Sequence, residues 1–219
     1  MPNHNFPLCL RTFLVTAASW LLVGCSDPAD KVAKATTSDA KKPVTSPSQA
    51  GKEYVLRAES KIGFIGSKVT GSHEGGFKKF AGKFAIADGK MVGTPGFQIA
   101  MASTWADNPK LEGHLKAPDF FDVAKFPVSS FTITAVEPAG TDHKVTGNFA
   151  LHGVTKSISF PATIKVSDDV VTVAAEFSIN RKDFNINYPG MPNDLIRENV
   201  VIKLDLKATP GVARPEETL

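Results

Sequence analysis

The stretch ISFPATIKVSDDVVTVAAEFSI, residues 158–179, decides the fold. Its apolar residues alternate with small or polar ones on both sides of a Ser-Asp-Asp turn at positions 167–169. Alternation with period two predicts β-strands that bury one face, and a short polar turn between two of them predicts an antiparallel hairpin.

The same alternation recurs on both sides of this hairpin, at residues 97–102, 130–134, 144–151 and 200–207. Regular strands separated by short turns predict an antiparallel all-β sandwich or barrel. Asp107-Asn108-Pro109 interrupts the rhythm and is typical of a helix start. We therefore expect one or two short helices within residues 108–125, which cap one end of a barrel.

The N-terminus resembles a bacterial lipoprotein signal. Arg11 precedes an apolar run over residues 12–23 that is too short to span a bilayer, and Leu22-Val23-Gly24-Cys25 closes it. We expect residues 1–24 to be removed as a signal peptide and Cys25 to carry acyl chains, palmitate among them, that anchor the protein. The alternative is a cleaved soluble periplasmic protein with an incidental cysteine.

These features predict a location in the bacterial cell envelope, facing the periplasm. Ser26 after the cysteine favours the outer membrane, although Asp27 follows it. Residues 25–51 hold the acylated cysteine and a stretch rich in Ala, Lys, Ser, Thr and Pro, which predicts a disordered linker. We expect the barrel over residues 52–208 and a flexible tail over 209–219.

Composition excludes several classes of function. Residues 53–219 carry nineteen basic and nineteen acidic side chains, so the domain has no electrostatic footprint for nucleic acid. After signal removal Cys25 is the sole cysteine, which excludes disulfides and cysteine-based metal or redox sites from the domain. The histidines lack the spacing of metal ligands, and we expect no metal and no cofactor.

Phenylalanine dominates the aromatic residues of the domain, with thirteen between Phe64 and Phe184. Several lie on the predicted inward faces. One interpretation is a solid core of phenylalanine rings. The other is a cavity, since an eight-stranded barrel is just wide enough to hold one small ligand.

The segment GHLKAPDFFDVAKFP, residues 113–127, resembles the signature of the YceI-like family. Further family-like segments follow the same order along the chain, at residues 60–64, 77–84, 147–156 and 181–184. The resemblance implies a lipocalin-like, eight-stranded antiparallel barrel whose hydrophobic lumen binds a polyisoprenoid or another long-chain amphiphile. Asn185 stands where the family usually has glycine, and residues 187–193 form a variable insert.

The pattern and the resemblance together nominate a set of binding residues. His114 and Arg181 are candidates for contacts with a lipid head group. The alternative for His114 is a histidine that satisfies backbone groups, and the alternative for Arg181 is a pair with Asp183. Of the neighbours in the Asp-Phe-Phe-Asp motif, we expect one ring to line the cavity and the other to pack the cap onto the wall. The expected cavity-lining residues are Phe64, Phe97, Phe120, Phe121, Phe131, Phe149, Phe160 and Phe177.

Three functions fit these observations. The favoured one is a non-catalytic, lipid-anchored barrel that binds, sequesters or carries a polyisoprenoid-like lipid. The alternative is an envelope interaction or stress protein with a packed barrel. An enzyme acting on a lipid would have to use Asp119, Asp122, His114 or Arg181, and we expect no enzyme, since no serine-hydrolase motif is present. The sequence leaves the oligomeric state open.

Overall fold

The structure is a computed structural model that describes Met1 and residues 27–42, 51–88 and 90–219. The predicted signal peptide beyond Met1 and the predicted acylation site at Cys25 lie outside the described residues. Within those described ranges, no helix has the length and apolar character needed to cross a membrane.

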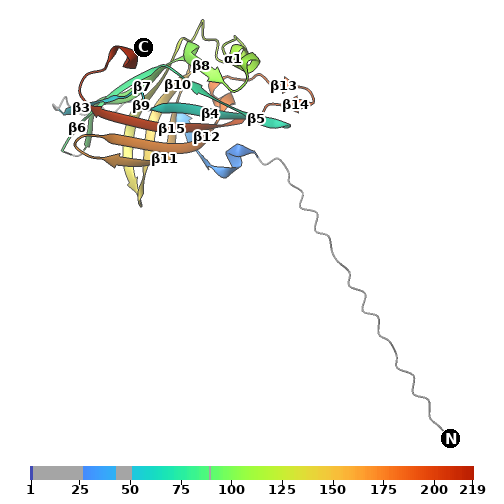
Figure 1. Cartoon of the computed structure of the whole chain (residues 1–219), viewed down its shortest axis with the longest axis horizontal. Coiled ribbons are helices and arrows are strands. Elements are labelled where there is room, and N and C mark those ends of the chain that lie inside the picture. The colour runs from blue at the N-terminus through green and yellow to red at the C-terminus, as the bar shows by residue number, and fades with distance from the viewer. Residues whose placement is uncertain (2–26, 43–50, 89) are drawn as a thin grey trace.

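An antiparallel barrel of eight strands confirms the predicted fold class (Figure 1). The last strand, β15, pairs with both β12 and β3, and this double pairing closes the ring. In order around the wall the strands are β3 (Lys52–Leu56), β6 (Phe80–Ala87), β7 (Lys90–Ala100), β9 (Val128–Ala139), β10 (Asp142–Leu151), β11 (Val154–Val166), β12 (Val171–Asn180) and β15 (Asn199–Pro210).

The hairpin predicted from residues 158–179 is β11 and β12, with Val166 paired to Val171 across the turn. The Ser167 N–H donates to the Val170 carbonyl at 2.9 Å and tightens that turn. The alternating residues Ile158, Phe160 and Phe177 are all buried, because every second side chain of a strand faces the lumen.

The end of the barrel beside the helix is called the cap end. There, β4 (Lys61–Lys68) pairs with β15, β5 (Gly71–Phe77) with β4, and β8 (Thr104–Ala106) with β5. The short elements that complete this end are η2 (Met101–Ser103), α1 (Pro109–Leu115), η3 (Arg181–Phe184), β13 (Gly190–Met191) and β14 (Asp194–Leu195).

The helix α1 begins where the sequence predicts. The Asn108 side chain accepts hydrogen bonds from the N–H groups of Lys110 and Leu111, and Pro109 occupies the first turn. The helix ends sooner than expected, at Leu115, and a series of turns continues to Phe126. Asp122 has a φ of 45° in these turns, a left-handed conformation that interrupts regular helix.

The prediction of a disordered linker is wrong for residues 27–42, which we call the N-terminal strap. It contains η1 (Pro28–Lys31), β1 (Ala33–Lys34) and β2 (Thr36–Asp39). β11 and β12 pair directly only over residues 163–166 and 171–174. Beyond that, β2 pairs with β11 and β1 pairs in parallel with β12, so the strap fills the gap between the two strands. Backbone groups at open strand edges hold it, and they require no apolar side chains.

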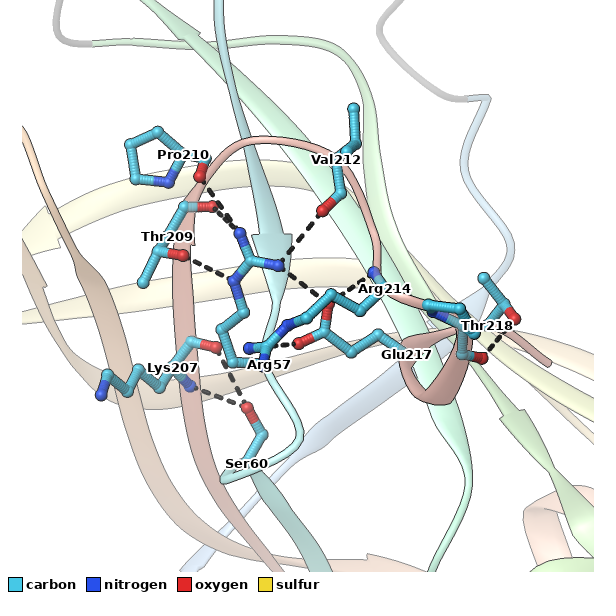
Figure 2. A network of polar contacts seen from close by, with 10 residues as sticks. Arg57, Ser60, Lys207, Thr209, Pro210, Val212, Arg214, Glu217 and Thr218 are labelled. Atoms are coloured by element: carbon cyan, nitrogen blue, oxygen red, sulfur yellow. Dashed lines mark hydrogen bonds and ion pairs between the residues drawn. The ribbon is translucent and has the colours of Figure 1, made fainter.

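The prediction of a flexible tail over residues 209–219 is also wrong. Thr209 and Pro210 belong to β15, and η4 (Pro215–Glu217) folds back onto the barrel. Figure 2 shows the cause: the Arg57 guanidinium forms an ion pair of 2.8 Å with Glu217 and donates to carbonyls of residues 209, 210 and 212.

The Arg57–Glu217 pair is almost fully buried, with 9% and 1% of the side chains exposed. Burial alone would raise the pKa of Glu217. Hydrogen bonds from the Arg214 N–H and the Arg57 guanidinium, together with both positive charges, hold that pKa below its ordinary value. The carboxylate is therefore retained in its charged form and fastens the tail.

Candidate functional site

A cavity of about 270 Å³ occupies the cap end of the barrel. Its walls come from β4, β5, β7, β9, β10, β12 and β15, and α1 with the turns after it covers the top. The lining is almost entirely apolar. It consists of Phe64, Gly66, Ser67, Lys68, His73, Phe77, Ile99, Leu111, Leu115, Phe120, Phe121, Ser129, Phe149, Leu151, Ile179, Arg181, Ile186, Ile196, Val200 and Ile202.

Aromatic rings form one side of this cap cavity. The ring centroids of Phe64 and Phe77 lie 5.8 Å apart, and Phe121 lies 6.3 Å from the first and 6.1 Å from the second. Gly75 makes this arrangement possible, because a Cβ there would meet the Phe64 ring at 2.4 Å. A contact that short is prohibitive, so glycine at position 75 leaves the room that the ring occupies.

Both rings of the Asp-Phe-Phe-Asp motif line the cap cavity, so the prediction that only one does is wrong. That prediction assumes regular structure, in which neighbouring side chains diverge. Phe120 and Phe121 instead lie in a turn, where the N–H of Phe120 donates to the Ala117 carbonyl and that of Phe121 to the Leu115 carbonyl. The turn brings both rings over the lumen.

Four of the expected lining residues lie deeper and divide the lumen. Phe97, Phe131, Phe160 and Phe177 form a row with ring centroids 5.6, 5.6 and 3.9 Å apart, which we call the Phe ladder. Two small apolar cavities, each of about 50 Å³, flank these rings. The barrel thus combines both interpretations of the sequence: rings fill its middle and space remains at the cap end.

Arg181 lines the cap cavity, yet its guanidinium is committed to the protein. Its nitrogens donate to the carbonyls of Ile186 at 2.5 Å, Arg197 at 3.0 Å and Ile196 at 3.2 Å. Burial lowers the pKa of this arginine, and the charge of Glu198 opposes the effect. The geometry makes Arg181 a clamp on the segment 186–197, which forms the rim of the cavity.

His114 lies on the outer side of the cap and does not belong to the cavity lining. Its Nε2 is 2.6 Å from a carboxylate oxygen of Asp119, and its ring contacts Phe120 and Tyr188 edge-on at 4.9 Å each. The structure therefore brings together His114 and Asp119, which the enzyme hypothesis needs, but neither residue lines the cavity.

The sequence does not predict the polar groups at the rim of the cap cavity. Lys68 forms an ion pair of 2.5 Å with Asp194, and His73 lies 2.9 Å from Asp107. The Lys68 hydrogen bond lowers the pKa of Asp194, and a hydrogen bond from the Glu74 N–H is the largest influence that lowers the pKa of Asp107. Lys68 lies four residues after Phe64 in β4, so the two side chains face the same side of the strand. This alternation is the only local sequence pattern that could have identified Lys68 as a rim residue.

The chemistry available to the cap cavity is burial of apolar surface. Ser129, one of its few polar groups, donates its hydroxyl to the Ala150 carbonyl at 2.7 Å and is fully occupied within the wall. Among the residues that the structure describes, no group of His, Cys, Asp or Glu side chains converges as metal ligands do. An apolar cavity with a few polar groups at its rim is typical of a site for an amphiphilic molecule.

Comparison with known proteins gives the class. The model of the YceI-like domain family matches residues 54–208, and the chain belongs to this family. A UPF0312 protein of Pseudomonas putida is 29% identical over 165 residues, which cover 69% of this chain and 85% of the relative. A UPF0312 protein of Pseudomonas savastanoi is 32% identical over 152 residues, covering 63% of this chain and 78% of the relative.

Two solved structures share the barrel. BcnA of Burkholderia cenocepacia superposes with a TM-score of 0.63 at 26% identity, over 69% of this chain and 98% of that one. A domain of Saccharophagus degradans, described as polyisoprenoid-binding and implicated in plant cell wall breakdown, gives a TM-score of 0.61 at 18% identity. It covers 74% of this chain and 100% of that domain, and at this identity the likeness concerns the fold alone.

Proposed function

We propose that this protein is an envelope lipoprotein whose barrel binds one long-chain amphiphile, of the polyisoprenoid class or similar to it, in the cap cavity. The observation that carries the proposal is the cap cavity itself, an apolar space of about 270 Å³ roofed by α1 and the Asp-Phe-Phe-Asp turn. Membership of the YceI-like family and the polyisoprenoid-binding description of one structural neighbour support the class of ligand.

The physical basis of binding is the removal of hydrocarbon from water. A cavity of about 150 Å³ holds a benzene molecule, so 270 Å³ accommodates about ten carbon atoms. At roughly 0.8 kcal/mol for each buried CH₂, such a chain gains about 8 kcal/mol before the costs of ordering. The remainder of a longer ligand, with its polar head, would extend past Lys68 and His73 at the rim.

The same proposal includes the location. The Leu22-Val23-Gly24-Cys25 motif supports acylation of Cys25 and exposure to the periplasm, and Ser26 after it favours an anchor in the outer membrane. The role proposed for the domain is binding rather than catalysis: it sequesters or carries its lipid. An interaction protein with no cargo is the competing outcome.

The test is mass spectrometry of lipid extracted from the mature protein, purified from its native host. Gly66 offers a blocking variant, because it shares a face with Phe64, lines the cap cavity and has no atom within 4 Å of an added Cβ. We expect a stoichiometric lipid in the wild type and its loss in Gly66→Phe. Gly71→Phe is the matched control, since an added Cβ there also meets nothing and Gly71 lies outside the lining.

The control should retain the lipid in full. An empty wild-type protein that also refuses added isoprenoid alcohols would refute the proposal in favour of a protein partner. Equal lipid content in Gly66→Phe and Gly71→Phe would show that the cargo lies elsewhere.

A further inference from the structure

The first described residue of the N-terminal strap is fastened to the rim of the cap cavity. Asp27 has 8% of its side chain exposed, and one carboxylate oxygen accepts the Ser67 hydroxyl at 3.0 Å and the Ala29 N–H at 3.1 Å. The other oxygen lies 3.7 Å from the Arg197 guanidinium. Ser67 itself lines the cap cavity, so the strap begins at the mouth.

Two turns beside this attachment expose large apolar side chains to solvent. Val69 follows the end of β4, and its N–H donates to the Leu195 carbonyl of β14 at 3.2 Å. Val69, Leu195 and Met191 are 55%, 51% and 61% exposed. We call these three residues the apolar lip. Figure 1 shows β13 and β14 at the end of the barrel opposite the C-terminal segment.

The residues that hold Asp27, the residues of the apolar lip and two residues that line the cap cavity are neighbours in the chain. Asp27 contacts Ser67 and Arg197, which lie two residues from Val69 and Leu195 respectively. Lys68 and Ile196, between them, line the cap cavity and pair with each other as a β-bridge. The predicted acylation site, Cys25, is only two residues before Asp27, and two residues span at most about 7 Å.

We infer that the apolar lip is a membrane-contacting surface, held against the bilayer by the anchor at Cys25, and that it orients the mouth of the cap cavity toward the lipid. The inference rests on the proposed function, since it requires the acylated cysteine. A long linker would let the domain tumble above the membrane. Here the strap is ordered from residue 27, so the anchor can lie no more than about 7 Å along the chain from Asp27.

The arrangement gives a lipid a short path. The turns at residues 68–70 and 190–196 are joined to each other by the Lys68–Ile196 bridge and the Val69–Leu195 hydrogen bond, and together they form one rim. A chain that leaves the bilayer at the apolar lip passes over this rim and enters the cap cavity behind it. Exposed apolar side chains on turn tips would enter the boundary between head groups and acyl chains. Lipid would therefore exchange between membrane and barrel without crossing open water.

The test measures which end of the barrel meets the membrane. Full-length, acylated protein is reconstituted into vesicles of phosphatidylethanolamine and phosphatidylglycerol that contain a spin-labelled lipid as quencher. Leu195→Cys carries an environment-sensitive fluorophore. Val166→Cys is the matched control, because Val166 is likewise exposed, at 59%, but lies beside the β11–β12 turn.

We expect the bilayer quencher to reduce fluorescence at position 195 at least about twofold more than at position 166, the difference expected for a side chain in the interface. Asp27→Ala, which unfastens the strap, should bring the value at 195 toward that at 166 while the protein still floats with the vesicles. Equal quenching at the two positions in the wild-type background would overturn the inference.

Three further outcomes separate this inference from the proposed function. If position 195 is not quenched but the same sample carries a stoichiometric lipid, the membrane orientation is refuted and the binding function stands. If intact mass shows no acyl group on Cys25, the anchored orientation is refuted whatever the cavity contains. If position 195 is quenched and the barrel is empty, the orientation stands and the binding function fails.

Discussion

The Phe ladder should set the length of hydrocarbon that the barrel accepts. The cap cavity accommodates about ten carbon atoms, and the stacked rings of Phe160 and Phe177, 3.9 Å apart, occupy the lumen deeper in the barrel. In a homologous series of fatty acids we expect affinity to rise about fourfold for each added carbon, the equivalent of about 0.8 kcal/mol. Beyond about ten carbons it should level off, because further carbons remain in water.

Phe177→Ala moves this limit. Removal of the ring vacates space for about six carbons in the small cavity that Phe177 lines, and this cavity shares Phe149, Ile179 and Ile202 with the cap cavity. We expect the plateau to shift by about four to six carbons and the free energy of unfolding to fall by about 3–5 kcal/mol. Displacement of a fluorescent apolar dye measures the affinities, and thermal unfolding measures the loss of stability.

Phe126→Ala is the matched control, because Phe126 contacts His152 and Gly153 and lines none of the three interior cavities. If the alanine at 177 prevents folding, Phe177→Leu tests the same step with a smaller vacancy. The reasoning would be refuted by a wild-type affinity that keeps rising with chain length, or by a plateau that the 177 and 126 variants share.

Three other changes probe the tail, the rim and the cap. Because the pKa of Glu217 is lowered on folding, its contribution to stability is present above the ordinary carboxyl pKa and is lost as pH falls through the lower folded-state pKa. Proteolysis of the tail in the wild type should therefore begin in this pH range. Proteolysis of the tail in Glu217→Gln should show no such pH dependence. Tail cleavage with the same pH profile in both proteins would contradict this. Arg181→Met should lower the free energy of unfolding by about 2–4 kcal/mol and speed hydrogen exchange over residues 186–197, since three carbonyls lose their donor. Unchanged hydrogen exchange in this segment would exclude the role of Arg181 as a clamp. His114→Ala should change lipid affinity less than about threefold, because the ring lies outside the cavity, and a loss of about tenfold or more, measured by dye displacement, would restore His114 as a head-group contact.

The wall of the barrel could be predicted from the sequence, because a strand with one buried face leaves its period in the chain. The start of α1 could also be predicted, since Asn108 and Pro109 are residue types typical of a helix N-terminus. The end of α1 could not be predicted, because the turns after Leu115 depend on backbone hydrogen bonds that no residue type indicates.

The two ends of the domain could not be predicted, for different physical reasons. The N-terminal strap is held through backbone groups at the gap between β11 and β12, so its composition resembles that of a linker. The tail is held by an ion pair between Arg57 and Glu217, 160 residues apart, which no local pattern can reveal. The role of Arg181 was missed likewise, because its acceptors are carbonyls, which every residue has.

The double pairing of β15 has a consequence for the biogenesis of this protein. β15 is the final strand of the chain, and β12, β3 and β4 all use its edges. Until the chain is complete through residue 210, these partners have open edges and the lumen has no wall on one side. A nascent chain therefore cannot enclose a ligand, and a chain cut before residue 199 should be readily degraded by proteases. Any loading of the barrel is necessarily a step that follows completion of β15.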